Sequence, residues 1–419
     1  MSNSVVDVWG PVAPGVRSSF PPAPEPHDEW PLAGGTAWVY YSPLNRRQLR
    51  RPVILSDGFS AGSSNLDQLW NGLEENGDFR FVTELHAIGR DVIILGYGDR
   101  TASIVDNAET AIECVRRTIA ERVGQARLTV GGFSMGGIVT RYALAKMEHD
   151  SSLPDHETST YFSYDSPHHG GWFPVALQAF THFATEQWGD TDGVGPVLQQ
   201  LSGLLNSPAA KQMARWHIAK PGDTPKPAPE RAEFLQKLDE LGSWPRSPRK
   251  IGVANGVDSG SGNGIKGDVT AVRGDGETLR DTWLKTQAQG DQTVARLQKA
   301  DGAPVSVRTS GLPDIDGAPG GVFTLPSAAG DTGSFGLAAL LMGVLGNKVD
   351  PDVITTSCFI PSISAVAAGD IDDPKALYRP IASDASALDA FKCAGRNEGH
   401  TVMTEELGSW LVNEIVTAE

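Results

Sequence analysis

The chain has 419 residues, of which 40% are hydrophobic and 21% charged, so it can bury a sizeable core and is not disordered overall. Its formal net charge of −16 argues against nucleic acid or an anionic membrane as the main partner. No apolar run reaches the roughly 20 residues of a transmembrane helix, and the first residues show no secretory signal. These features predict a cytoplasmic globular protein, built as one large domain with insertions or as two domains.

Strands and helices are expected to alternate over much of the chain. Residues 1–33 are rich in proline and predict an irregular N-terminal arm. Apolar, β-branched runs predict strands at 36–43, 52–59, 91–99, 126–133, 160–171 and 250–256. Helical spacing of apolar residues predicts helices near 66–75, 103–123, 138–148 and 404–416. This alternation is typical of an α/β fold with a mostly parallel, doubly wound sheet.

Two long segments interrupt the alternation. Residues 172–248 are predicted to be helical and carry several large apolar residues before a proline-rich stretch, so we interpret them as a lid-like insertion. Residues 259–350 are rich in Gly, Asp and Thr, with short β-like pieces at 304–311 and 320–327, and are interpreted as a β-rich insertion. The predicted core then comprises three parts, namely residues 34–171, 249–258 and 351–419.

The segment Gly132-Phe133-Ser134-Met135-Gly136 fits the G-x-S-x-G pattern of a nucleophile elbow. A serine on a sharp strand-to-helix turn adopts unfavourable backbone angles, and the two glycines remove side chains that would clash there. The turn exposes the Ser134 hydroxyl at the carboxyl end of the sheet, over a helix N-terminus that favours developing negative charge. An apolar strand precedes this pattern and a predicted helix follows it, which is the setting that an elbow requires.

Four segments together resemble the α/β-hydrolase superfamily, on its lipase and esterase side. They are PVILSDGF, GGFSMGGIVTRYAL, YDSPHHGG and NEGHT, and the resemblance is good over roughly residues 50–172. It implies an α/β-hydrolase fold and acyl transfer through a Ser-His-Asp triad without a cofactor. Asp57 departs from the pattern, because many lipases have a histidine at this position.

The resemblance also implies an oxyanion hole, which needs two backbone N–H donors. One would be Met135, which follows the nucleophile. The other would lie on the loop after the first matched strand, at Phe59 or, as a close alternative, Ser60. His168 and His169 stand in a Ser-Pro-His turn that is structural in many lipases, and they are interpreted in the same way.

The chain order Ser…Asp/Glu…His of this fold places the base late. His400 is the one histidine after residue 217, and the residues around it suit a loop that leads into a helix. Asp258, which follows the strand at 250–256, is the first choice for the acid, and Asp165 is the main alternative. Further candidates lie on the approach to His400, namely Asp370, Asp372, Asp373, Asp384 and Asp389.

The apolar residues of 172–248 favour an ester with an apolar portion, a small-molecule or lipid-like substrate. The same triad could serve an acyltransferase, a thioesterase or cyclase, or an amidase, and a non-catalytic hydrolase-like binding protein is a second alternative. No metal site is expected, because the acidic turns lack the spacing of a calcium loop. The three cysteines, Cys114, Cys358 and Cys393, are expected to be reduced and buried, with a Cys358–Cys393 bridge left open.

Overall fold

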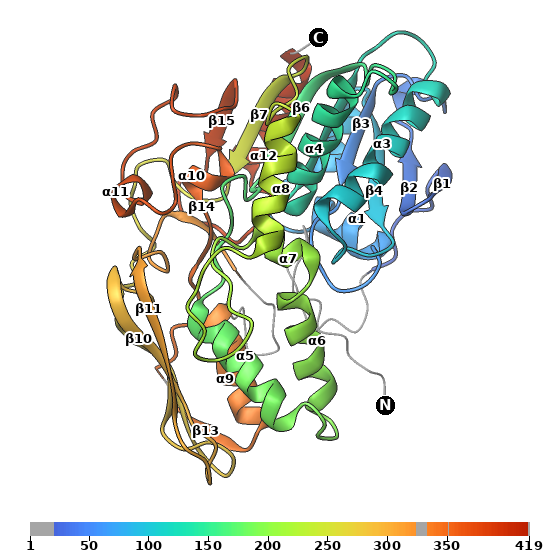
Figure 1. The fold of residues 1–419 in the computed structure, drawn as a ribbon. Coiled ribbons are helices and arrows are strands. Elements are labelled where there is room, and N and C mark those ends of the chain that lie inside the picture. Colours follow the sequence, from blue (N-terminus) through green and yellow to red (C-terminus); the bar gives the residue numbers. More distant parts are fainter. Residues whose placement is uncertain (1–20, 324–332, 351, 418–419) are drawn as a thin grey trace.

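A mostly parallel sheet forms the core of the chain. The computed structural model describes residues 21–323, 333–350 and 352–417. Eight strands pair in the order β1-β2-β4-β3-β5-β6-β7-β15, with β1 and β2 antiparallel to their neighbours and the other pairs parallel (Figure 1). The strands are β1 (Asp28–Leu32), β2 (Gly35–Tyr40), β3 (Pro52–Ser56), β4 (Asp91–Tyr97), β5 (Leu128–Phe133), β6 (Thr158–Tyr164), β7 (Arg249–Ala254) and β15 (Ala390–Cys393). The expected α/β architecture is therefore confirmed.

Helices cover both faces of this sheet because successive strand side chains point to opposite sides. Ile54 of β3 packs in one core with residues of α3 and α4, whereas Val53 and Leu55 pack in a second core with residues of α1, α2 and α12. These helices are α1 (Leu66–Glu74), α2 (Phe81–Ala87), α3 (Ile104–Glu121), α4 (Met135–His149) and α12 (Glu405–Thr417). Within the described ranges, no helix is both long and apolar enough to cross a membrane.

Two predictions for the first half of the chain are wrong in detail. Residues 28–32 form strand β1 rather than part of an irregular arm, since Trp30 and Leu32 bury their side chains, and Pro31 is tolerated on an edge strand. Residues 1–20 of that arm lie outside the described residues. Helix α4 begins at Met135, three residues before the predicted start, although glycine disfavours helix at 136 and 137.

The predicted lid-like segment contains α5 (Val175–Trp188), α6 (Gly195–Leu205), α7 (Pro208–Met213) and α8 (Pro229–Glu240). These four helices do not all lie together. Helix α8 packs on the core, where the Phe234 ring lies 6.0 Å from that of Tyr142 in α4. Helices α5 and α6 extend below the core sheet, with α5 against the second sheet and α6 packed on α5 (Figure 1).

Five strands from the described part of residues 259–350 form that second sheet, in the order β11-β10-β9-β8-β13 and with antiparallel pairing. Its strands are β8 (Thr270–Gly276), β9 (Thr282–Lys285), β10 (Gly290–Leu297), β11 (Val305–Leu312) and β13 (Asn347–Val349). The predicted β-like piece at 320–327 does not join it. Within this piece, Gly320–Val322 forms β12, which pairs with β14 (Cys358–Pro361), and residues 324–327 lie outside the described residues. Short helices complete the fold, namely η1 (Pro43–Asn45), α9 (Ser334–Val344), α10 (Ser362–Ala365) and α11 (Pro374–Leu377).

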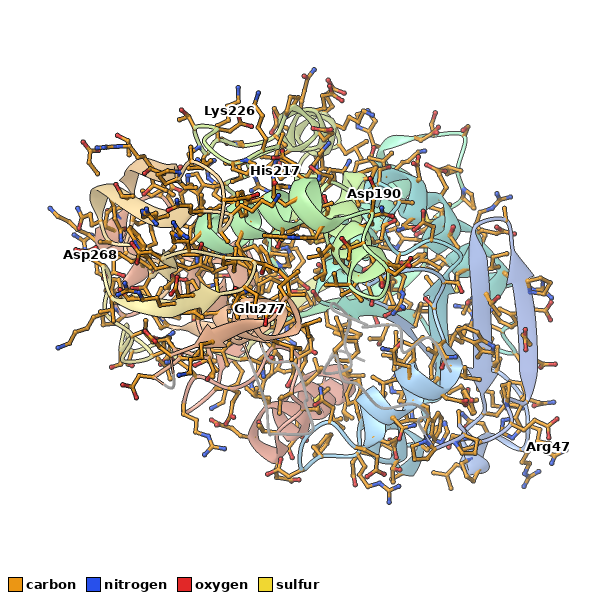
Figure 2. The ribbon with its side chains drawn as sticks, turned by 90° about the horizontal axis from the view of Figure 1, so that it is seen from below. Arg47, Asp190, His217, Lys226, Asp268 and Glu277 are labelled. Carbon is orange, nitrogen blue, oxygen red and sulfur yellow. The ribbon has the colours of Figure 1, made fainter. Side chains whose placement is uncertain are left out.

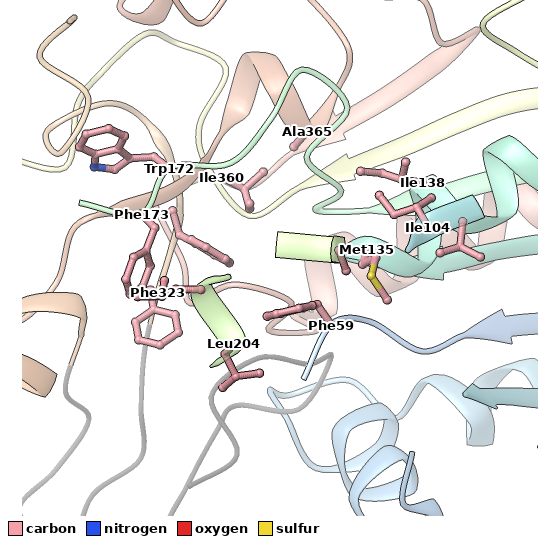
Figure 3. Packing of buried hydrophobic residues seen from close by; sticks show 14 of the residues in the cluster. Phe59, Ile104, Met135, Ile138, Trp172, Phe173, Leu204, Phe323, Ile360 and Ala365 are labelled. Atoms are coloured by element: carbon pink, nitrogen blue, oxygen red, sulfur yellow. The ribbon is translucent and has the colours of Figure 1, made fainter. Parts of the chain in front are cut away.

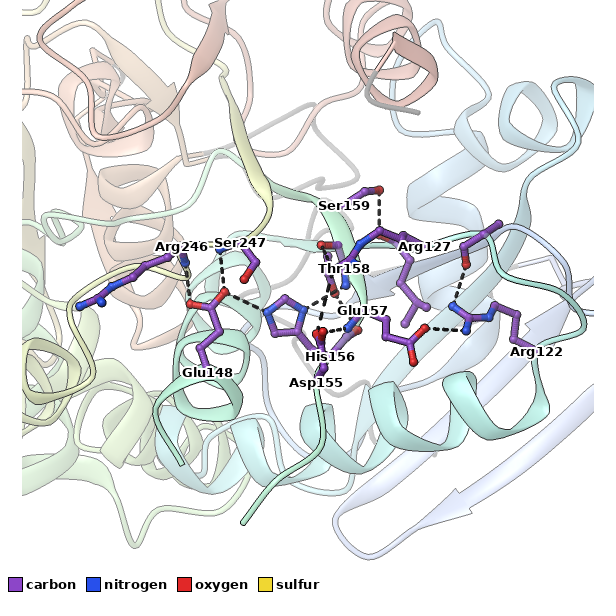
Figure 4. Close-up of polar contacts among 12 residues, drawn as sticks. Arg122, Arg127, Glu148, Asp155, His156, Glu157, Thr158, Ser159, Arg246 and Ser247 are labelled. Carbon is purple, nitrogen blue, oxygen red and sulfur yellow. Dashed lines mark hydrogen bonds and ion pairs between the residues drawn. The ribbon is translucent and has the colours of Figure 1, made fainter. Parts of the chain in front are cut away.

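The partly buried carboxylate of Glu148 ties the start of β6 and the approach to β7 to helix α4 (Figure 4). Glu148 of α4 accepts hydrogen bonds from the backbone N–H groups of Arg246 and Ser247, at 2.6 and 2.7 Å. The Nε2 atom of His156 lies 3.1 Å from the same carboxylate. Because β6 and β7 are neighbours in the sheet, these contacts help to set where the two strands begin.

Many charged side chains are exposed on the surface of the molecule. Figure 2 shows this for Arg47, Asp190, Lys226, Asp268 and Glu277, all of which are exposed. They come from widely separated parts of the chain.

Candidate active site

Ser134 lies at a strained turn between β5 and α4. Its backbone angles are φ 52° and ψ −122°, and its side chain is buried with 6% exposed. A positive φ is costly for a residue with a Cβ atom and persists only where the surrounding structure enforces it. Its N–H donates to the carbonyl of Tyr164 on the adjacent strand, at 2.9 Å. The predicted strand–turn–helix setting of the serine is therefore present.

The glycines around Ser134 allow the backbone to pack closely. A Cβ atom on Gly132 would lie 2.5 Å from the carbonyl carbon of Gly136. A Cβ atom on Gly136 would overlap the carbonyl oxygens of Ser56 and Asp57 at the end of β3. The glycine pattern thus brings the start of α4 against the loop that carries Phe59.

His400 is paired with a buried carboxylate. Its Nδ1 atom lies 2.6 Å from Oδ2 of Asp165, and the two side chains are 9% and 0% exposed. The Nε2 atom of His400 is buried and has no hydrogen-bond partner among the described residues. The imidazole is thus oriented through one nitrogen, while the other has no partner in the described part of the chain.

The carboxylate beside His400 belongs to Asp165, the alternative acid, and not to Asp258, the first choice. Asp165 follows the last residue of β6 at a φ of 48°, and its N–H donates to Val253 of β7. Asp258 lies beyond the end of β7 with an exposed side chain. The five aspartates between 370 and 389 make no hydrogen bond or ion pair with His400.

An apolar cavity opens beside Ser134, with about 570 Å³ of space free of protein atoms when the solvent at its open side is included. Four of its lining residues, Phe59, Leu204, Trp172 and Phe173, are drawn in Figure 3, with Met135 near Phe59. The Phe359 ring, which also lines the cavity, lies 4.9 Å from that of His400 in an edge-to-face contact. The full lining is Phe59, Ser134, Pro167, Gly171, Trp172, Phe173, Gln178, Leu204, Leu205, Ala210, Met213, Ala214, His217, Phe359 and Ile360.

The polar lining residues offer little charge to a ligand. The amide of Gln178 is bound to three backbone groups, the carbonyls of Phe173 and Trp216 and the N–H of Ile218. Burial lowers the pKa of His217, which favours its neutral form at neutral pH. The cavity therefore suits an uncharged, apolar group.

Phe59, on the loop after β3, and Met135, directly after Ser134, are the residues predicted to form an oxyanion hole. Phe59 lines the cavity together with Ser134. Met135 is the first residue of α4, and the first N–H groups of a helix have no partner within it. Ser60, the close alternative to Phe59, is fully buried.

The loop after β3 is anchored by the buried pair of Asp57 and Arg100. The Asp57 carboxylate accepts hydrogen bonds from Gly58 N–H and the Ser64 hydroxyl, both at 2.6 Å, and lies 3.7 Å from Nη1 of Arg100. Arg100 also donates to the carbonyl of Ala61, at 2.8 Å. Asp57, which departs from the lipase pattern, thus holds the loop that carries Phe59, and sequence reasoning missed its partner Arg100.

Replacing Arg100 with methionine is expected to destabilise the protein by about 3–5 kcal/mol, because it leaves the Asp57 carboxylate buried without its cation. Urea unfolding measures this loss. The matched control is Arg273→Met, which breaks an ion pair with Asp281 whose side chains are about half exposed and should cost under ~1 kcal/mol. Equal stability of the two variants would show that the buried pair does not anchor the loop.

The adjacent histidines of the Ser-Pro-His turn do not contact the His400–Asp165 pair. His168 is buried between Ser163, 2.9 Å from its Nε2, and Arg141, 3.4 Å from its Nδ1. Burial, with Arg141 beside it, holds the pKa of His168 well below its usual value. The Nδ1 atom of His169 lies 2.6 Å from the carbonyl of Gly369. These contacts tie the turn to neighbouring segments.

A buried carboxylate links the cavity wall to the second sheet. Asp316 accepts hydrogen bonds from the indole N–H of Trp172, at 2.7 Å, and from the N–H of Gln287, at 2.6 Å. Burial raises the pKa of Asp316 to about 7. The segments that carry Asp316 and Gln287 therefore support the wall of the cavity.

The described residues contain neither a metal-binding cluster nor a disulfide bond. Among the described residues, no group of three or more His, Cys, Asp or Glu side chains could hold a metal ion. Cys114, Cys358 and Cys393 are each buried and unbridged in the described part of the chain.

No family model and no curated protein matches the chain. Among solved structures, it resembles the mature form of Bacillus licheniformis lipase BlEst2 at 14% identity and a TM-score of 0.30, over 52% of this chain and 71% of that one. The propeptide form matches over 52% of this chain but 38% of its own length, at 12% identity and a TM-score of 0.31. A fungal esterase from Rhizomucor miehei matches at 16% identity and a TM-score of 0.31, over 56% and 67% of the two chains. These are remote likenesses that span about half of this chain.

Proposed function

We propose that this chain is a serine hydrolase of the α/β-hydrolase type that cleaves a carboxylic ester with an apolar acyl or alcohol portion. The observation that carries the proposal is the His400–Asp165 pair, whose Nδ1 side is bound at 2.6 Å while Nε2 has no partner among the described residues. The strained backbone of Ser134 and its apolar cavity support the same assignment. Asp165 replaces Asp258 as the acid of the proposed triad.

In the proposed reaction, Nε2 of His400 takes the proton of the Ser134 hydroxyl as the oxygen attacks the ester carbonyl. Asp165 orients the imidazole and stabilises its protonated form through Nδ1. The backbone N–H groups of Phe59 and Met135 would stabilise the oxyanion of the tetrahedral intermediate. His400 then gives its proton to the departing alcohol, and water activated by the same nitrogen releases the acid from Ser134.

The walls of the cavity indicate what part of the substrate lies there. Leu204 and Leu205 come from the end of α6, and Ala210 and Met213 come from α7. We propose that α6 and α7 act as a cover over Ser134 and that the cavity takes an uncharged acyl chain. Helix α8, in the same segment, packs on the core and is not part of this cover.

The proposal is tested with p-nitrophenyl esters whose acyl chains differ in length and in terminal charge. Neutral aliphatic esters are expected to be hydrolysed with kcat/KM at least about tenfold above that of an ester ending in a carboxylate, because desolvating a charge in an apolar cavity is costly. Hydroxylamine added as a competing nucleophile distinguishes hydrolysis from acyl transfer, since hydroxamate as the main product would indicate a transferase. Absence of p-nitrophenol release with every ester would contradict the proposed activity.

A further inference from the structure

Asn255 links the strand ends that carry the two members of the His400–Asp165 pair. It follows β7, is fully buried, and its backbone N–H donates to Oδ1 of Asp165 at 3.0 Å. Its side-chain Oδ1 accepts from the N–H of Thr401 at 2.9 Å, and its Nδ2 donates to the carbonyl of Val402 at 2.8 Å. One residue therefore holds the acid through its main chain and the loop after His400 through its side chain.

Other contacts hold the same loop. Tyr164, which precedes Asp165, donates its hydroxyl to the carbonyl of Val402 at 2.8 Å. The N–H of His400 donates to the carbonyl of Val322 in β12, also at 2.8 Å. Thr401 has a φ of 60°, so the turn after His400 adopts a backbone conformation that residues with a Cβ atom rarely take. Such a turn needs outside partners to persist, and the amide of Asn255 supplies two of them.

The contacts of Asn255 with this loop depend on its side chain being an amide. Thr401 offers an N–H donor and Val402 a carbonyl acceptor. The side chain that binds both must therefore carry an acceptor and a donor close together, as a short amide does. An aspartate at 255 would keep the acceptor but lose the donor, and would place a second carboxylate beside the Asp165 group. An alanine would remove both hydrogen bonds.

We propose that Asn255 is a positioning residue for the base, which sets where the imidazole of His400 lies relative to Asp165 and Ser134. The inference rests on the proposed function for its kinetic consequence, but the His400–Asp165 hydrogen bond itself is observable without any substrate. Asn255 is not among the residues that line the cavity, so its effect falls on the chemical step rather than on substrate binding.

The test compares Asn255→Ala and Asn255→Asp with the wild-type protein by ester kinetics and by NMR of the histidine ring protons. Asn255→Asp preserves the side-chain volume and serves if the alanine variant does not fold. Both variants are expected to lower kcat by about 10²-fold with KM within about twofold, because a displacement of about 1 Å in a catalytic group costs that much. The Nδ1–H resonance of His400, assigned by its loss in His400→Gln, should broaden or disappear in both.

Asn347→Ala is the matched control. Asn347 is also a buried asparagine whose amide holds a turn, through the carbonyls of Met342 and Leu345 and the N–H groups of Thr278 and Leu279, but it lies in the second sheet. It should lower stability and leave kcat and the His400 resonance unchanged. If the folded Asn255 variants keep the resonance and the wild-type kcat, the positioning role is wrong. If the wild-type protein cleaves no ester, the proposed function is wrong, and the His400 resonance alone then tests the positioning role of Asn255. The two proposals can therefore fail separately.

Discussion

Replacing Ser134 with alanine is expected to lower kcat for ester hydrolysis by about 10⁴-fold or more, because no other group would form the acyl-enzyme. The fold should survive, since the smaller side chain fits the same buried position, and the free energy of unfolding should change by less than ~1 kcal/mol. Ester kinetics together with urea unfolding measure both quantities on the same preparations.

The matched control is Ser310→Ala, which removes a hydroxyl on the exposed edge of the second sheet that contacts Asp291. This variant should keep the wild-type kcat. Wild-type turnover in a folded Ser134→Ala protein would place the nucleophile elsewhere and would contradict the proposed mechanism.

Exchanging the carboxylates separately is expected to identify the acid of the triad. Asp165→Asn should lower kcat by about 10⁴-fold, because an amide does not hold the imidazole in the tautomer that accepts the serine proton. Asp258→Asn should leave kcat within about twofold of wild type, since the Asp258 side chain is exposed and Asp165 is the residue within hydrogen-bond distance of His400.

The Asp165→Asn substitution keeps the volume of the side chain, which matters because the backbone of Gly321 packs directly against Oδ2. Circular dichroism and urea unfolding of both variants separate a loss of chemistry from a loss of fold. The opposite result, with Asp258→Asn inactive and Asp165→Asn active, would identify Asp258 as the acid.

Short, local patterns made the elbow and the base predictable from the sequence. The glycines at 132 and 136 flank Ser134 because backbone atoms of neighbouring segments lie where Cβ atoms would be, so the constraint is visible within five residues. His400 could be named because the chain order of the fold leaves one candidate after residue 217.

The acid could not be settled from the sequence, because its position depends on contacts between distant segments. Asp165 reaches His400 across 235 residues of sequence, and both Asp165 and Asp258 follow core strands. Arg100 and Asn255 were not identified from the sequence for the same reason. The role of Arg100 depends on a buried contact with Asp57, and the side chain of Asn255 binds a residue 146 positions away.

Local propensity also misled in three places. Proline-rich composition concealed β1, because burial of Trp30 and Leu32 on an edge strand outweighed the turn preference. Glycine at 136 and 137 hid the first turn of α4, where close packing requires small residues. The composition of residues 259–350 gave no sign of helix α9, whose apolar residues show no helical alternation of polarity.

The proposed activation of Ser134 by His400 is tested most directly by covalent labelling with a fluorophosphonate, which reacts with activated serines. The modified peptide is identified by mass spectrometry in the wild-type protein and in His400→Ala. We expect modification of Ser134 in the wild-type protein and at least about 10²-fold slower modification without His400. Modification of another residue, or labelling of Ser134 at the same rate without His400, would contradict it.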